Sequence, residues 1–168
     1  PVFQRYRGHA VESWTVFLEA RSVRGQGWAH ETPFEICEGG NRTSPIAVLT
    51  RATVRPWAVF RFWRHVPGIE AVIPDHHEGL LFKIGLGEVP WLHQVTFSIW
   101  RTPEEMEAFA YQGPHRAAAR ESLDKGWFSE DLFARFAVLG GKGEWEDHDP
   151  LARSLKEHSE HREEPVRE

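Results

Sequence analysis

Hydrophobic and polar residues alternate in several stretches of the chain, and each alternation predicts a β-strand. In these stretches β-branched and aromatic residues recur at every second position, which is typical of strands with one buried face. The predicted strands are Ser13–Val23, Ile46–Val54, Leu80–Leu86, His93–Trp100 and Arg135–Leu139. The last strand is expected to follow a short helical turn that begins at Ser129.

Two helices are predicted between these strands, and each begins with a proline at a first-turn position. The first starts at Pro56 and is expected to end at Pro67-Gly68. Its recurring aromatic residues are Trp57, Phe60 and Trp63. The second begins with Thr102 as N-cap and Pro103 as first residue, and it restarts after a break at Gly113-Pro114.

The order strand, helix, strand, strand, helix, strand predicts an α+β fold, the ferredoxin-like split βαβ unit with an antiparallel sheet. Because the face with His93, Val95 and Phe97 is strongly apolar, we expect both helices to cover it. The other face is more polar and could line a barrel interior or meet a second sheet. Its expected residues are Arg51, Lys83, Gln94, Thr96 and Trp100.

The upstream segment looks like the end of a second unit, because Ser13–Trp28 and Ala134–Trp145 both run from a strand through a basic residue and glycine to tryptophan. We therefore predict a C-terminal remnant of a first unit, with its linker, at residues 1–43 and a complete unit at 44–141. Residues 142–168 are predicted to be an acidic, flexible tail. The last 25 residues carry the whole net charge of −5.

Composition excludes several classes of protein. The neutral body has no basic excess, which argues against nucleic-acid binding. The single Cys37 excludes an internal disulfide and a cysteine-ligated iron–sulfur or zinc centre, so a cytoplasmic setting is expected. The apolar stretches of this sequence are all too short to span a membrane. Eight Trp and eleven Phe residues indicate an aromatic-rich core, or a pocket for a large planar or long apolar ligand.

Several sequence blocks resemble the spheroidene monooxygenase family. They occur in the family's order over about residues 1–141. The blocks are Glu12–Glu19 (ESWTVFLE), Ile46–Pro56 (IAVLTRATVRP), Arg61–Pro67 (RFWRHVP), Leu81–Trp100 (LFKIGLGEVPWLHQVTFSIW), Gly113–Arg120 (GPHRAAAR) and Gly126–Leu139 (GWFSEDLFARFAVL). Family members are longer at the N-terminus, in agreement with a missing part of the first unit.

This resemblance implies a fold of the dimeric α+β barrel type and an O2-dependent monooxygenase of carotenoid biosynthesis. Such an enzyme adds a keto oxygen to an acyclic, spheroidene-like carotenoid through a haem iron, with electrons from a ferredoxin-type donor. Insertion of oxygen into an unactivated carbon requires activated O2, which a metal or organic cofactor must supply because side chains alone do not. Two alternatives stay open: a non-catalytic haem- or lipid-binding protein, and a cofactor-free oxygenase, of the same superfamily.

With the family as guide, the candidate catalytic residues are His93 and His115. His115 follows the Gly113-Pro114 break and is the first candidate for the haem iron, with His93 as the alternative. The predicted cofactor-binding residues are His115, Arg116, Arg120, Phe82, Phe97 and Phe109, the arginines as partners of the haem propionates. The structural alternatives are an exposed helix-terminal residue for His115 and a hydrogen-bonded core residue for His93.

Two expectations concern partners. The sheet face left uncovered in this chain is expected to cause self-association. The protein is also expected to contact a membrane peripherally.

Overall fold

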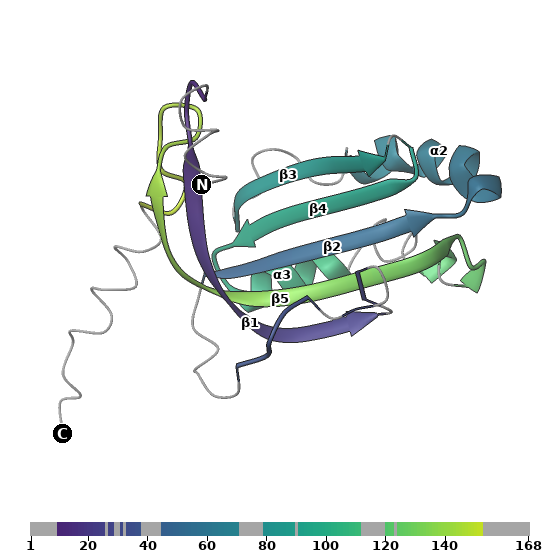
Figure 1. Cartoon of the computed structure of the whole chain (residues 1–168), viewed down its shortest axis with the longest axis horizontal. Coiled ribbons are helices and arrows are strands. Elements are labelled where there is room, and N and C mark those ends of the chain that lie inside the picture. The colour runs from purple at the N-terminus through teal and green to yellow at the C-terminus, as the bar shows by residue number, and fades with distance from the viewer. Residues whose placement is uncertain are drawn as a thin grey trace.

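The computed structural model describes residues 10–25, 27–28, 31, 33–37, 45–70, 79–89, 91–111, 120–122 and 124–152, with the backbone alone at 65–70, 88 and 111. Five strands form one antiparallel sheet in the order β1-β5-β2-β4-β3 (Figure 1). The strands are β1 Trp14–Gly25, β2 Ile46–Val54, β3 Leu80–Val89, β4 His93–Trp100 and β5 Phe128–Gly143. Strands β5, β2, β4 and β3 have the order of the ferredoxin-like unit, which confirms the predicted fold class.

The strand of the upstream segment does not stand apart from this unit. It pairs with β5 as an edge strand of the same sheet. Strands β2 and β4 have the predicted bounds, whereas β3 and β5 are longer than predicted. The expected helical turn at Ser129 is wrong, because Ser129 lies inside β5.

Both helices lie where the sequence predicts them, but the first one ends later than predicted. A 3-10 turn, η1 (Pro56–Ala58), leads into α2 (Val59–Glu70), so Pro67 does not end this helix. A proline removes one helical hydrogen bond, but its fixed φ is itself helical, so the chain can continue. The other helix is α3 (Pro103–Tyr111).

A capping box begins α3 at Thr102, the residue that the sequence predicts as N-cap. The Glu105 backbone N–H donates to Thr102 Oγ1 over 3.1 Å, and the Thr102 backbone N–H donates to Glu105 Oε2 over 3.1 Å. These reciprocal bonds satisfy two of the N–H groups that a helix start leaves open. The start of α3 is therefore fixed by its own sequence.

The face of the sheet that α3 covers is the opposite of the predicted one. Met106 of α3 is buried with Val48 and Trp100, and Phe109 stacks on Trp100 with ring centroids 5.2 Å apart. We call this side the helix face. Thr96 and Ser98 share the side of β4 that carries Trp100.

Phe97, Val95 and His93 therefore point to the other side of the sheet, which we call the front face because it is turned to the viewer in Figure 1. Arg51 lies on the front face as well, since it is directly opposite Val95 in the register. The prediction that helices cover the side with His93 is wrong. Leu80 and Phe82 differ from the alternation as well. A bulge between them places the two residues on opposite faces of the sheet.

Strands β1 and β5 bend together at the end of the sheet and curve up at the left of Figure 1. Their ladder shifts register between Phe17 and Leu18 and between Ala20 and Ser22, and such bulges increase strand twist. The bend brings Trp14 to 4.8 Å from Phe82 of β3, ring centre to ring centre. It closes one end of the front face with aromatic side chains.

The first part of the predicted flexible tail belongs to the folded unit. Lys142 and Gly143 are in β5, and Leu151 is fully buried in the core cluster with Ile99 and Phe136. Trp14 Nε1 donates to Asp149 Oδ1 over 3.2 Å, which holds this segment against β1. The predicted start of the tail at residue 142 is too early. The segment is acidic overall, so its composition gives no sign that one of its leucines is buried in the core.

Candidate functional site

The front face carries an apolar band that runs across the four strands of the ferredoxin-like unit. Its members are buried or half-buried and belong to one core cluster. They are Ala47, Leu49, Phe82, Phe97, Ile99, Leu132, Ala134, Phe136 and Val138. Phe82 contacts Phe97, Trp14 and Trp145, so aromatic rings dominate the end of the band near the bend of β1 and β5.

A buried ion pair lies in this apolar band. Arg51 Nη1 donates to Glu130 Oε2 over 2.6 Å, and the side chains of Arg51 and Glu130 are 5% and 11% exposed. Both are central on the sheet, Arg51 in β2 and Glu130 in the neighbouring β5. A charge removed from water must be paired to be tolerated, so each residue depends on the other.

Trp28, from the segment that follows β1, covers this pair. The Arg51 guanidinium carbon lies 5.0 Å from the centre of the Trp28 ring, a cation–π contact. A tight turn places the ring, because Trp28 and Glu31 exchange backbone hydrogen bonds of 2.7 and 3.1 Å. Gly27 has φ +100, and a Cβ there would lie 2.4 Å from the Glu31 carbonyl oxygen, so only glycine fits.

Next to the ion pair, a row of polar side chains crosses three strands. Thr53 of β2 is directly opposite Glu130 of β5 on one side and His93 of β4 on the other. Residues that are directly opposite in an antiparallel pair share a face, so their side chains are neighbours. The buried Thr53 Oγ1 has no hydrogen-bond partner among the described residues. The row therefore offers a hydroxyl to a ligand oxygen at the edge of the apolar band.

The predicted site residues do not all lie in one place. His93, Phe82 and Phe97 are on the front face, whereas Phe109 packs on Trp100 on the helix face. The sheet separates them, so one pocket cannot contain both Phe97 and Phe109. The half-buried His93 lies on the front face at the start of β4, away from the aromatic cluster that Phe82 forms with Trp14 and Trp145.

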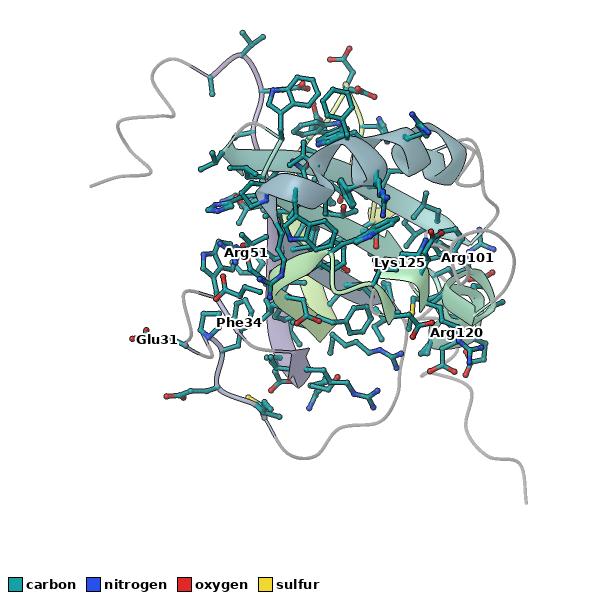
Figure 2. All side chains as sticks on the ribbon, turned by 90° about the vertical axis from the view of Figure 1, so that its right-hand side faces the viewer. Glu31, Phe34, Arg51, Arg101, Arg120 and Lys125 are labelled. Atoms are coloured by element: carbon teal, nitrogen blue, oxygen red, sulfur yellow. The ribbon has the colours of Figure 1, made fainter. Side chains whose placement is uncertain are left out.

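The predicted arginines are divided in a similar way. Figure 2 looks along the sheet and shows Arg120 on the side of Arg101, opposite Arg51 and Phe34. Arg120 is exposed. A haem held by His93 on the front face would therefore not have Arg120 as its propionate partner. His115 and Arg116 lie outside the described residues.

His93 supplies an imidazole on the front face, a side chain that commonly holds a haem iron. Arg51 does not fit the role of a propionate partner, because Glu130 and Trp28 already hold its guanidinium. Cys37 is a poor alternative ligand, although it is exposed. Partial desolvation and then the neighbouring Glu19 raise the pKa of the Cys37 thiol, which disfavours the thiolate that binds iron.

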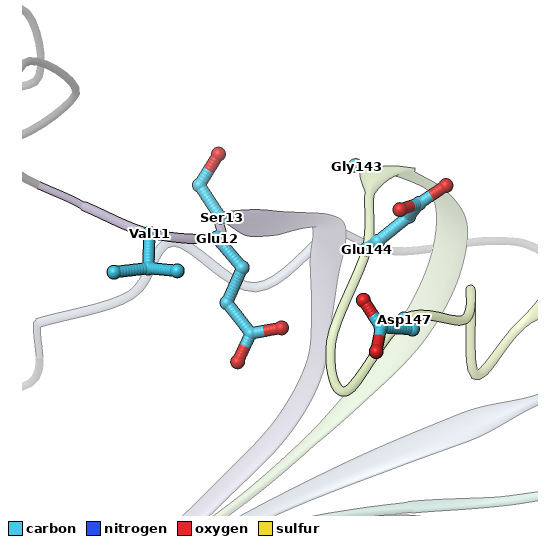
Figure 3. Close-up of a pocket in the computed structure, with 6 residues that line it drawn as sticks. All are labelled: Val11, Glu12, Ser13, Gly143, Glu144 and Asp147. Carbon is cyan, nitrogen blue, oxygen red and sulfur yellow. The ribbon is translucent and has the colours of Figure 1, made fainter.

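The open hollow at the bend of β1 and β5 has a different chemistry. It has a volume of about 390 Å3 and is lined by Val11, Glu12, Ser13, Gly143, Glu144 and Asp147 (Figure 3). Three of these side chains are carboxylates, and Glu12 Oε2 already accepts a hydrogen bond of 2.8 Å from the Glu146 backbone N–H. Its polar lining does not suit a long apolar ligand.

The polar row was missed in part by sequence reasoning. The pairing of Arg51 with Glu130 depends on the register of β2 against β5, which no local pattern reveals. One signal was present, since Glu130 occupies a position of the alternation Leu132, Ala134, Phe136 that should be apolar. A charge at such a position indicates a buried partner.

The comparisons agree with this architecture. A solved structure from Fusobacterium nucleatum, whose description names it a monooxygenase, is similar to this chain with a TM-score of 0.52. The two are 13% identical, and the match covers 77% of this chain and 52% of that one. This likeness agrees with the ferredoxin-like α+β fold that the strand order shows. No family model matches the chain.

The sequence relatives are more specific. A spheroidene monooxygenase of Cereibacter sphaeroides is 44% identical over 157 residues, which are 92% of this chain and 48% of that protein. One from Rhodobacter capsulatus is 42% identical over 160 residues, 94% of this chain and 66% of that protein. The chain belongs to the spheroidene monooxygenase family, of whose curated members it spans about half to two thirds. Among the described helices, none has the length and hydropathy of a membrane-spanning segment.

Proposed function

We propose that the chain is part of a monooxygenase of carotenoid biosynthesis, which adds a keto oxygen from O2 to an acyclic, spheroidene-like carotenoid. The observation that carries this proposal is the 42–44% identity to spheroidene monooxygenases over more than nine tenths of the chain. The half-buried aromatic residues of the front face, Phe82 and Phe97, support it, because a polyene requires apolar contacts.

In this proposal the carotenoid lies along the front face, with Phe82 and Phe97 against its chain. The polar row at the edge of the band then holds an oxygen atom of the bound molecule, through the Thr53 hydroxyl. The Arg51–Glu130 pair fixes the position of this row, and Trp28 keeps water away from it. These residues orient the ligand and exclude solvent.

A haem would supply the O2 activation that side chains cannot. The resemblance puts His115, with Arg116 and Arg120, first, but Arg120 lies on the side of the sheet opposite the front face. A haem that acts on a carotenoid on the front face would instead be held by His93, so His93 is the ligand proposed here and the His115 set is the alternative. A ferredoxin-type partner is proposed as the electron donor. The site residues, the haem and the donor rest on the family resemblance.

The test of this function uses the protein with its upstream sequence, expressed in cells that accumulate an acyclic carotenoid. Under isotopically heavy O2, the carotenoid should gain a heavy keto oxygen in place of two hydrogens, as seen by mass spectrometry. Cells without the gene are the control. A carotenoid that stays unchanged, or a keto product without the heavy isotope, would contradict the proposal.

We also propose that the isolated chain self-associates through its front face, where Leu86 and Val89 of β3 are 52% and 40% exposed. Light scattering should show a dimer or larger species. Leu86→Glu should shift it toward the monomer by about tenfold in dissociation constant, because a charge would have to be buried. Thr96→Glu, an exposed position on the helix face, is the matched control and should leave the distribution unchanged. A wild-type monomer at high concentration would refute the idea.

A further inference from the structure

One end of the molecule exposes aromatic side chains that no described contact buries. Trp57 and Phe60, in η1 and α2, are 60% and 89% exposed, and Trp91 in the turn between β3 and β4 is 62% exposed. Together they form what we call the aromatic end. Figure 1 shows α2 and this turn at the same end of the sheet, and Figure 2 views the molecule from that end. Exposed apolar groups in such a cluster indicate a contact surface.

The aromatic end is one continuous surface because α2 and the turn are joined. Trp63 of α2 donates its indole N–H to the Trp91 carbonyl oxygen over 3.1 Å, and the two rings meet edge to face at 5.2 Å. Trp91 has φ +71, a conformation that bulky residues rarely adopt. Strain of this kind is retained where a side chain must be held in a given place.

The outer side of α2 alternates aromatic and basic residues. Phe60 and Arg64 are four residues apart, and Trp57 and Arg61 are also four apart, so all four side chains share one side of the helix and all are exposed. The inner side has Ala58, which is fully buried. An amphipathic helix with aromatic and arginine side chains on its exposed side fits the boundary between lipid headgroups and acyl chains.

The charge of this region selects the kind of lipid. The chain has no Asp or Glu between Glu38 and Glu70, while the outer side of α2 carries Arg61 and Arg64. Arginines next to exposed apolar rings are attracted to anionic headgroups. We propose that the aromatic end docks on a membrane surface that contains anionic lipids, with Trp57, Phe60 and Trp91 entering the headgroup layer.

This inference deepens the proposed function, because a carotenoid dissolved in a bilayer must be taken up at its surface. The docking proposal can be wrong while the proposed function is right, because docking is measured without any carotenoid. Oxygenation of a detergent-solubilised carotenoid would in turn not require docking.

The experiment is co-sedimentation of the chain with vesicles of phosphatidylcholine alone or mixed with phosphatidylglycerol. Wild type should bind the anionic vesicles, and Phe60→Ser should weaken this binding about tenfold through the loss of a buried ring. Arg61→Gln with Arg64→Gln should weaken binding to anionic vesicles about tenfold or more, and raised salt should do the same.

The matched control is Leu139→Ser. Leu139 is 63% exposed, but it lies in the part of β5 beyond its pairing with β2, away from α2. This variant should bind as wild type does. Wild type that fails to sediment with anionic vesicles, or equal losses for Phe60→Ser and Leu139→Ser, would overturn the proposal. Phe60-dependent self-association without lipid binding would assign the surface to a protein contact instead and would overturn it as well.

Discussion

Arg51→Met is expected to destabilise the fold by about 3–5 kcal/mol, because it leaves the Glu130 carboxylate buried without its partner. Urea unfolding, followed by circular dichroism, measures the change in the free energy of unfolding. The double variant Arg51→Met with Glu130→Leu should recover most of the loss, since it removes the uncompensated charge.

A second ion pair provides the control. Arg135 Nη1 lies 3.1 Å from Glu107 Oε1 on the helix face, but their side chains are 23% and 44% exposed. Solvent screens this pair, so Arg135→Met should cost only about 0–1 kcal/mol. Equal losses for Arg51→Met and Arg135→Met would mean that the Arg51–Glu130 pair is not buried in solution.

Loss of the haem absorption band is the second large effect that we expect, in His93→Ala of the full-length protein after addition of haem. An imidazole on the front face is the ligand that oxidation of a carotenoid on that face requires, and without it a haem would not be held there. His115→Ala should keep the band.

Arg120→Gln makes this test sharper. Arg120 and the front face lie on opposite sides of the sheet, so Arg120 is out of place for a haem held by His93. Arg120→Gln should therefore leave haem binding unchanged. Loss of the band in His115→Ala and Arg120→Gln, with a normal band in His93→Ala, would assign the haem to the set that the resemblance puts first and would contradict oxidation on the front face.

The sequence predicts the elements of this fold better than their faces. Strands β2 and β4 have the predicted bounds because their alternation is strong and β-branched residues are frequent. The start of α3 is also predicted, since Thr102 and Glu105 form a purely local cap. Local signals thus suffice where local contacts decide the structure.

The exchanged faces have a physical reason. Both sides of β4 carry large apolar residues, Ile99 and Phe97 on one and Trp100 on the other, so composition does not tell which side a helix covers. A shift of one residue in register exchanges the faces, and register depends on distant strands. The start of β5 was missed because the charged Glu130 interrupts the apolar alternation. Its partner Arg51 is 79 residues away, so the local sequence does not show that Glu130 is buried.

The claim that the carotenoid binds on the front face is tested most directly by a pair of variants in the full-length protein. Leu86 and Thr96 are exposed residues of β3 and β4, Leu86 on the front face and Thr96 on the helix face. The measurement is the rate of heavy-oxygen incorporation into an acyclic carotenoid, as a function of carotenoid concentration. We predict that Leu86→Glu raises KM about tenfold or more, because a carboxylate opposes an apolar ligand, while Thr96→Glu behaves as wild type. A normal KM for Leu86→Glu with a raised KM for Thr96→Glu would place the substrate on the helix face and contradict this account.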